Sequence, residues 1–242
     1  MNQHSASRTQ DVAALSDLLV GKEMVIFDFD GVIADSEVLS LSTLQTSLRA
    51  FGIDHSLEET RRAFLGTSMS HIVDFVGRHG TGSAADFPAH WENALFDRFK
   101  SDLGPVPHLV DTLGLLDHLD LQFCIASSGT FRRIGIALDV MGLRSRFDHV
   151  FSAEQVQRGK PAPDVFLFAA AKRGVAPANC LVIEDSPHGI QAACAAGMHS
   201  VGFVGGSHVR DIAQGHGQLL LDAGADMVLH SYAGLSASAF VK

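Results

Sequence analysis

The octapeptide MVIFDFDG, residues 24–31, has the composition of a buried strand that opens into a loop. Its first residues are apolar, and branched and aromatic side chains predominate, which is typical of a strand covered on both faces of a parallel sheet. Two acidic residues, Asp28 and Asp30, follow where the chain is expected to leave the sheet. An Asp-Gly pair is also common in surface turns, so the interpretation depends on the rest of the chain.

Downstream of this strand, the sequence predicts only helices as far as residue 103. Apolar residues recur at helical spacing over 36–51, and similar patterns follow at about 57–64, 69–78 and 86–100. Because no convincing strand interrupts them, we expect residues 37–103 to fold as an all-helical insertion.

Beyond residue 104, predicted helices and strands alternate. The expected strands are LQFCIAS (121–127), DHVFS (148–152), CLVIED (180–185), HSVGFV (199–204) and DMVLH (226–230), and a short helix is expected to close the chain. This alternation predicts βαβ units and an α/β fold, with a doubly wound, Rossmann-like parallel sheet that carries the helical insertion after its first strand. The expected domains are an N-terminal tail (1–20), an α/β core (21–36 and 104–242) and a helical cap (37–103).

The overall composition is that of a globular protein, with 46% hydrophobic and 19% charged residues. The formal net charge is −9 and no basic stripe is visible, so nucleic-acid binding is not expected. Apolar runs are too short for a membrane span, and the N-terminal residues lack the apolar segment of a signal peptide. We therefore expect a cytoplasmic protein that acts on a small molecule, and no protein partner is implied.

Cysteines, histidines and glycine-rich stretches give no independent site. Cys124, Cys180 and Cys194 lie in apolar runs without CxxC spacing, so we expect buried, reduced thiols. The 13 histidines show no HExxH or paired spacing, and most are expected at the surface. Residues 205–208 and 215–217 lack a P-loop lysine and are expected to form a flexible connection.

Polar side chains are concentrated where three predicted strands end. They are Asp28 and Asp30 after the first strand, Ser127 and Ser128 after FCIA, and Glu184 and Asp185 after CLVI. Ligands of open parallel sheets bind outside the carboxyl ends of the strands, so these residues are expected to converge. Helix capping is the alternative for both the serines and the Glu184-Asp185 pair.

Several carboxylates at one edge would repel one another unless a cation were present. Mg²⁺ prefers oxygen ligands and binds through one or two carboxylates plus phosphate oxygens. We expect Asp28 and Asp185 as direct ligands together with the backbone carbonyl of Asp30, and Glu184 as a direct ligand or as the partner of a metal-bound water.

A phosphate group could be held beside this metal. Lys160, in the predicted loop RGKPAPD, can neutralise a phosphate or a carboxylate as a point charge, although a solvated loop lysine is the alternative. The Ser127 hydroxyl and the amides of Ser128 and Gly129 can donate to phosphoryl oxygens. Gly31 would let the backbone approach the phosphate closely.

The four segments DFDGV (28–32), the serine after FCIA, GKPAPD (159–164) and EDSPHGI (184–190) together resemble the haloacid dehalogenase-like superfamily. Their order and spacing are similar to those of its branch of phosphatases and β-phosphoglucomutases with a helical cap. The resemblance implies that Asp28 attacks phosphorus and becomes an aspartyl-phosphate, and that Asp30 acts as general acid and base. It also implies Mg²⁺ as the cofactor, Lys160 as a catalytic cation and a mobile cap whose crossings lie near 34–37 and 103–107.

Two departures from the mutase pattern favour hydrolysis of a phosphomonoester. Ser40 stands where the mutase-like relatives carry a histidine, and Met69, in the stretch FLGTSMS, aligns with the arginine that holds their distal phosphate. The chain thus looks more like bacterial phosphatases of sugar acids such as 6-phosphogluconate, and the expected substrate is a sugar or sugar-acid phosphate. A sugar phosphomutase and a non-catalytic phosphate-binding protein are the alternatives.

Overall fold

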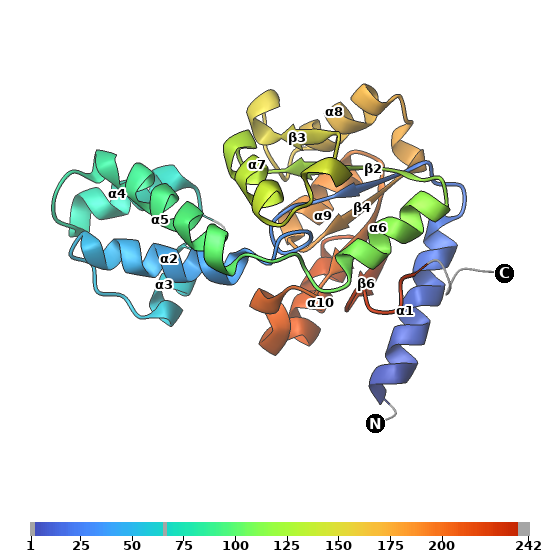
Figure 1. Cartoon of the computed structure of the whole chain (residues 1–242), viewed down its shortest axis with the longest axis horizontal. Coiled ribbons are helices and arrows are strands. Elements are labelled where there is room, and N and C mark those ends of the chain that lie inside the picture. The colour runs from blue at the N-terminus through green and yellow to red at the C-terminus, as the bar shows by residue number, and fades with distance from the viewer. Residues whose placement is uncertain (1–2, 65–66, 237–242) are drawn as a thin grey trace. The chain divides into compact units, whose positions relative to one another are not determined.

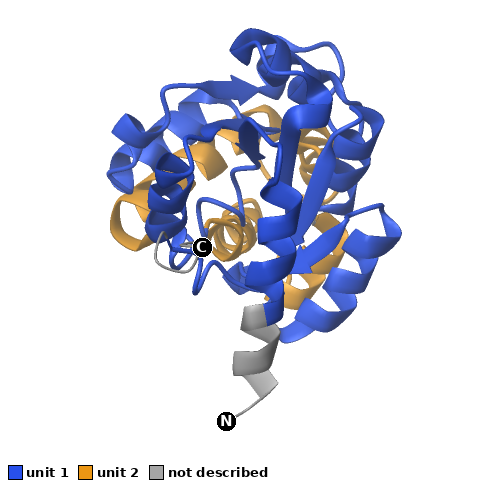
Figure 2. Cartoon of the chain, turned by 90° about the vertical axis from the view of Figure 1, so that its right-hand side faces the viewer, with its two compact units in different colours: residues 1–35, 105–242 blue, residues 36–104 orange. Residues whose placement is uncertain are grey.

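The computed structural model describes residues 3–64 and 67–236, which form two compact units (Figures 1 and 2). Unit 1 comprises residues 1–35 and 105–242, and unit 2 comprises Ser36–Gly104. The chain therefore leaves unit 1 once, directly after its first strand and the short loop that follows it. That unit 2 acts as a mobile cap stays a prediction.

Unit 1 is built on a six-stranded parallel sheet with the order β3-β2-β1-β4-β5-β6, which confirms the doubly wound fold. The strands are β1 (Met24–Phe27), β2 (Gln122–Ser127), β3 (Val150–Ser152), β4 (Cys180–Glu184), β5 (His199–Phe203) and β6 (Met227–Leu229). The chain runs outward from β1 to β3 and then returns to β4 beside β1. The topological switch point, where ligands of such sheets bind, therefore lies between β1 and β4.

Helices pack on both faces of this sheet (Figure 1). They are α1 (Gln3–Leu19), α6 (Leu109–His118), α7 (Phe131–Val140), α8 (Asp164–Arg173), α9 (Pro187–Ala195) and α10 (Ala213–Asp222). One apolar cluster joins α8 and α9 to alternate strand residues such as Met24, Ile26 and Val182. The intervening residues, among them Val25 and Phe27, are equally buried, so they face the opposite side of the sheet and the strands read as continuous apolar runs.

Unit 2 has its own apolar core. Its described elements are α2 (Glu37–Ala50), α3 (Leu57–Phe64), α4 (Met69–His79), a short 3₁₀ turn (Ala84–Asp86) and α5 (Phe87–Asp102). Leu48, Phe64, Val76 and Phe87 lie at the centre of this core, and Trp91 packs against them. The expectation that this block is helical agrees with these elements.

The N-terminal segment is not the loose tail that the sequence suggested. It forms helix α1, in which Leu15 and Leu19 are buried, and Asp11 accepts a hydrogen bond from the backbone N–H of His230. Tertiary packing thus stabilises a helix whose own sequence shows little amphipathic character.

The segment between β5 and β6 also differs from the expected flexible connection. Residues 207–212 form a 3₁₀ turn, and residues 213–222 form α10 despite Gly215 and Gly217. A Cβ at Gly217 would lie 3.3 Å from Val228 Cγ1, so at this position glycine allows close packing of helix on strand. The expected closing helix does not occur in residues 230–236, and residues 237–242 lie outside the described part of the chain.

The cysteine prediction was correct for two of three residues. Cys124 and Cys180 are buried, and burial raises the pKa of the Cys124 thiol to about 12. Cys194, at the end of α9, is exposed instead. Its surroundings in sequence, QAACAAG, consist of small residues that do not distinguish one face of the helix from another.

Candidate active site

The carboxyl ends of β1, β2 and β4 bring the expected site residues to one edge of the sheet. Asp28 follows β1 directly, and its backbone N–H still donates to Ile183 of β4 at 2.9 Å. Ser127 and Glu184 are the last residues of their strands, and Asp185 follows Glu184. Asp28, Glu184 and Asp185 each offer a carboxylate oxygen within 4.8 Å of the other two. The site therefore forms at the switch point.

The three acids of this cluster are shielded from water. Asp28 and Asp185 are each 8% exposed and Glu184 is 1% exposed. Burial, and then the negative charge of Glu184, hold the pKa of Asp28 well above its ordinary value. A buried set of hard oxygen donors with excess negative charge has the chemistry that a divalent cation such as Mg²⁺ requires.

Lys160 reaches into this cluster from the loop before α8. Its Nζ donates to Asp28 Oδ1 and to Glu184 Oε2, both at 2.6 Å, and its side chain is only 5% exposed. Burial alone would lower the pKa of Lys160, but the two carboxylates outweigh this effect and raise it. The alternative of a solvated loop lysine is wrong.

Glu184 is fixed on both of its oxygens. Oε1 accepts from the backbone N–H of Ser186 at 3.0 Å and from its hydroxyl at 2.8 Å, while Oε2 accepts from Lys160. A Cβ at Gly189 would overlap the Glu184 carboxylate, so glycine leaves the room that this side chain occupies. The N-cap of α9 is Ser186, whose Oγ accepts from Gly189 N at 3.0 Å. The capping alternative for Glu184 and Asp185 is therefore wrong.

The serines after β2 occupy different environments. Ser127 is buried, and its Oγ accepts from the backbone N–H of Gly129 at 3.0 Å, whereas Ser128 is exposed. The carbonyl of Gly129 accepts from Ser152 Oγ at 2.6 Å, which fixes the loop. Thr130 caps α7 by accepting from Arg133 N, so neither serine serves as the cap.

Asp30 is held by a residue that the sequence analysis did not select. Arg133, in the first turn of α7, donates from its terminal nitrogen to Asp30 Oδ1 at 2.7 Å, and both side chains are largely buried. A guanidinium fixes a carboxylate by charge and direction together. The available signal was positional, because Arg133 lies one helical turn beyond the loop SSGT at the carboxyl end of a strand.

Two histidines contact Asp185, although histidines were expected mostly at the surface. His208 Nε2 lies 3.1 Å from Asp185 Oδ2, and His216 donates from Nε2 to the Asp185 carbonyl at 2.6 Å. Both come from the segment after β5, whose sequence carries no periodic signal for such a role.

Gly31 has a steric role beside the acidic cluster, while its expected close approach to phosphate stays a prediction. It has φ +77°, and a Cβ there would overlap Asp185 Oδ2 and lie 2.7 Å from His208 Cε1. Glycine at this position therefore makes room for the acidic cluster itself, in a conformation that other residues rarely adopt.

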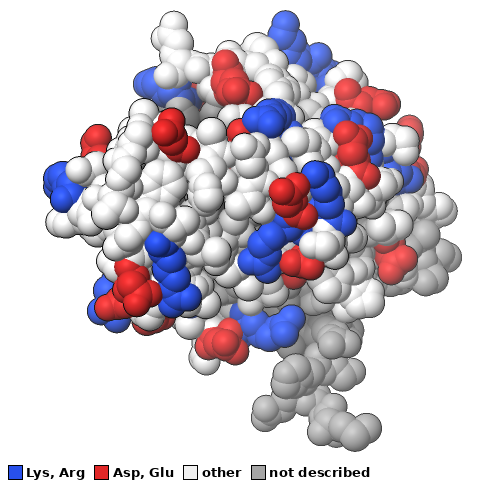
Figure 3. All heavy atoms as spheres, turned by 60° about the vertical axis from the view of Figure 1, so that its left-hand side comes forward, with Lys and Arg blue, Asp and Glu red and all other residues white. Residues whose placement is uncertain are grey.

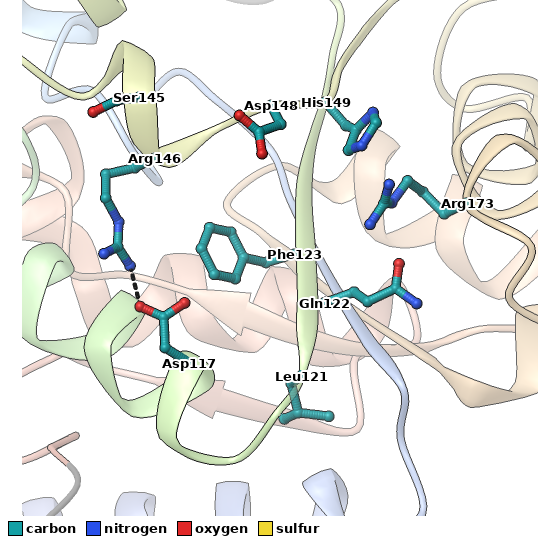
Figure 4. Close-up of a pocket in the computed structure, with 9 residues that line it drawn as sticks. All are labelled: Asp117, Leu121, Gln122, Phe123, Ser145, Arg146, Asp148, His149 and Arg173. Atoms are coloured by element: carbon teal, nitrogen blue, oxygen red, sulfur yellow. Dashed lines mark hydrogen bonds and ion pairs between the residues drawn. The ribbon is translucent and has the colours of Figure 1, made fainter.

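A depression of about 320 Å³ lies away from this site, at the amino ends of β2 and β3. Figure 4 shows Phe123, Arg146 and Asp117 on one side of β2, and Gln122 and Arg173 on the other. Arg146 pairs with Asp117 at 2.6 Å. The polar side chains that line the depression thus lie on both sides of β2, and two of them already pair with each other.

Comparison with known proteins identifies the family. A model of haloacid dehalogenase-like hydrolases matches residues 25–203. This chain belongs to that family. The 6-phosphogluconate phosphatase of Escherichia coli K12 is 31% identical over 194 residues, which cover 78% of this chain and 86% of the relative. The fructose-1-phosphate phosphatase of the same strain is 31% identical over 182 residues, covering 73% and 94%.

A solved structure of the family has the same architecture. A haloacid dehalogenase family hydrolase from Deinococcus radiodurans R1, crystallised with phosphate and sodium, aligns with a TM-score of 0.73 and 29% identity. The alignment covers 90% of this chain and 95% of that chain. The expected family and fold are therefore both confirmed.

Two further features concern the rest of the molecule. Among the residues described, no helix combines the length and apolar character needed to cross a membrane. On the face drawn in Figure 3, Lys and Arg side chains are interspersed with Asp and Glu side chains. Positive charge on that face is thus distributed among negative groups.

Proposed function

We propose that this protein is a Mg²⁺-dependent phosphomonoester hydrolase that acts on a small sugar or sugar-acid phosphate through an aspartyl-phosphate at Asp28. The observation that supports it most strongly is the buried Asp28 carboxylate, which Lys160 contacts at 2.6 Å beside Glu184 and Asp185. Such a carboxylate is positioned at the switch point of the sheet and has a cation beside it to balance incoming phosphate charge.

In the first half of the proposed reaction, an oxygen of Asp28 forms a bond to phosphorus while the bond from phosphorus to the leaving oxygen breaks. Asp30 gives its proton to that leaving oxygen. In the second half, water attacks phosphorus, Asp30 takes a proton from this water, and the bond between Asp28 and phosphorus breaks to release inorganic phosphate. Arg133 would keep Asp30 aimed at the reacting atoms.

Mg²⁺ fits the donor set of Asp28 and Asp185 together with the backbone carbonyl of Asp30, and when bound it would neutralise phosphate charge. For Glu184, we propose an indirect role. Both of its oxygens already accept hydrogen bonds from Ser186 or Lys160, which favours orienting a metal-bound water and holding Lys160 over direct ligation.

The phosphate would be bound by the loop after β2 and by Lys160. Because Ser127 Oγ accepts from Gly129 N, its own O–H remains a donor for a phosphoryl oxygen. The Gly129 amide is engaged in that same bond, so of the two amides we propose Ser128 as the main backbone donor. Gly31 contributes by leaving space for the Asp185 carboxylate.

The substrate class rests on relatives and on Met69 of unit 2. The named substrates of the two Escherichia coli relatives are a sugar-acid phosphate and a sugar phosphate. Met69 begins α4 and packs against the apolar core of unit 2, and it cannot bind a second phosphate. The glycine before it, Gly66, lies outside the described residues. These features favour hydrolysis over the mutase reaction.

The test is phosphate release from a panel of phosphorylated sugars and sugar acids, with wild type and Asp28→Asn compared at equal protein concentration. An amide cannot form the acyl phosphate, so turnover is expected to fall to less than a few per cent of wild type. Asp139→Asn, at an exposed carboxylate that pairs with Arg144, is the matched control and should turn over normally. Undiminished turnover by Asp28→Asn would contradict the proposal.

The mutase alternative is tested by supplying β-glucose 1-phosphate with a trace of the 1,6-bisphosphate. A hydrolase releases phosphate at least as fast as glucose 6-phosphate appears. Glucose 6-phosphate that formed much faster than free phosphate would establish a mutase. Phosphate release from any substrate at catalytic rates excludes a binding protein.

A further inference from the structure

The segment after β5 is attached to the loop after β1 by side-chain hydrogen bonds. The backbone N–H of Ser207 donates to Asp35 Oδ1 at 3.0 Å, and its hydroxyl donates to the same oxygen at 2.7 Å. These residues are 172 positions apart in the sequence. Asp35 thus fixes the residue that directly precedes His208.

Two glycines allow the His208 ring to lie where it does. A Cβ at Gly206 would lie 2.8 Å from the Gly31 carbonyl oxygen and 2.8 Å from His208 Nδ1, and a Cβ at Gly31 would lie 2.7 Å from His208 Cε1. Real Cβ atoms do not approach other atoms so closely, so any side chain at either position would displace the ring. Glycine at positions 31 and 206 therefore allows the His208 ring to occupy this position.

In that placement His208 contacts Asp185, the member of the acidic cluster that follows β4. Its Nε2 lies 3.1 Å from Asp185 Oδ2, with the ring 17% exposed, whereas Lys160 contacts Asp28 and Glu184. His216 Nε2 donates to the backbone carbonyl of Asp185 at 2.6 Å. Asp185 is thereby oriented at both its main chain and its carboxylate.

We propose that His208 is a positioning residue: it orients the Asp185 carboxylate and thereby raises the affinity of the site for Mg²⁺. The Asp35–Ser207 hydrogen bonds hold His208 in place. This rests on the proposed function. A ligating carboxylate binds metal more tightly when a fixed N–H donor holds its orientation, because less rotational freedom is lost on binding. Loss of such a partner typically reduces metal affinity about 10–100-fold.

The direct test is isothermal titration of Mg²⁺ into chelator-treated, dialysed protein, which measures binding without turnover. His208→Ala should bind Mg²⁺ about 10–100-fold more weakly than wild type. His208→Gln, which keeps an N–H donor on a similar reach, should bind with an affinity between the two. Ser207→Ala removes one of the two bonds to Asp35 and should show a smaller loss.

The matched control is His199→Ala. His199 Nδ1 lies 3.1 Å from Asp226 Oδ1, so the variant removes the same kind of contact at the amino end of β5, away from the acidic cluster. Its Mg²⁺ affinity should equal that of wild type. Thermal unfolding in chelator should show that His208→Ala and His199→Ala are both folded, and saturating Mg²⁺ should restore most turnover to His208→Ala.

Wild-type affinity in His208→Ala, or an equal loss in His199→Ala, would overturn the role of His208. These outcomes are separate from failure of the proposed function. A wild-type protein that binds no Mg²⁺ and releases no phosphate would contradict the proposed function. If the wild type binds Mg²⁺ and releases phosphate, the His208 variants decide whether His208 positions Asp185.

Discussion

At the carboxyl edge of the sheet the chain buries charged side chains against one another, whereas at the amino ends of β2 and β3 it leaves them around an open depression. The carboxyl-end site holds Asp28 and Glu184 against Lys160 at 2.6 Å, with the lysine side chain only 5% exposed. At the amino end, Arg146 is 35% exposed in its pair with Asp117. Both ends are polar, but only one removes its charges from water.

This difference indicates which end can perform chemistry. Burying charged groups is costly unless they are paired, so a fold retains such a cluster where a cation or a reacting group is to be bound. The amino-end depression has a volume of about 320 Å³, yet the partly exposed ion pair beside it, Arg146 with Asp117, contributes little energy. The chemistry of the lining residues is therefore a better guide to the site than the size of the hollow.

The largest expected effect that tests this contrast is removal of divalent cations. Excess chelator should abolish phosphate release, and added Mg²⁺ should restore it, because the buried carboxylates otherwise repel the phosphate. Ca²⁺ should inhibit, since its longer bonds and looser coordination could engage both oxygens of the nucleophilic Asp28. Full activity in chelator would show that the acidic cluster does not act through a metal.

A smaller effect is expected from the residue that holds Asp30. Replacement of a general acid typically costs about 10²–10⁴-fold in rate, and Asp30→Asn should fall in that range. Arg133→Ala leaves the acid in place but less well aimed, so we expect a fall in kcat of about 10-fold with little change in KM. Arg132→Ala, at the exposed neighbouring position, is the control. Equal kcat values for both arginine variants would remove Arg133 from the site.

The protonation of Asp28 predicts how stability depends on pH. Its pKa in the folded protein is raised above the ordinary 3.8, by burial first and then by Glu184. The contribution of this group to stability is thus fully present below that ordinary value and is lost as pH rises through the folded pKa. Bound Mg²⁺ offsets the repulsion between ionised Asp28 and the neighbouring carboxylates, which is larger at pH 7 than at pH 4. Mg²⁺ should therefore raise Tm more at pH 7 than at pH 4. An equal shift at both values would contradict this assignment.

The smallest effect is predicted at the amino end. Arg146→Gln breaks a half-exposed ion pair with Asp117, and such pairs contribute roughly 0–1 kcal/mol. Phosphate release should be unchanged, and the free energy of unfolding should fall by no more than that amount in urea titration. A large loss of turnover would show that the two ends of the sheet are coupled.

The same contrast explains what could be predicted from sequence. Strands such as CLVIE are buried on both faces and read as continuous apolar runs, so their ends, and with them Asp28, Ser127 and Glu184, could be placed on one edge by a topological rule. Lys160 could be selected by the segment GKPAPD, but its burial depends on Asp28, a residue 132 positions away.

The parts that were missed depend on tertiary contacts. Helix α10 contains two glycines that weaken any helical signal, and it is stabilised by packing of residues such as Leu220, which is fully buried. His208 gains its place from Asp35 through Ser207, and no local pattern in GGSH reveals that bond. Arg133 could have been found only by projecting the first turn of α7 onto the strand ends.

The most direct test of the central claim is to trap the phosphorylated enzyme. A nitrophenyl phosphate has a leaving group that needs little protonation, so Asp30→Asn should still transfer its phosphate to Asp28 but should hydrolyse the product slowly. In rapid-quench experiments with Mg²⁺, this variant should release nitrophenolate in a burst of one equivalent per enzyme. Mass spectrometry of the quenched protein should then place the phosphoryl group on Asp28. A phosphoryl group on another residue, or release of nitrophenolate and phosphate together without a burst, would contradict the account.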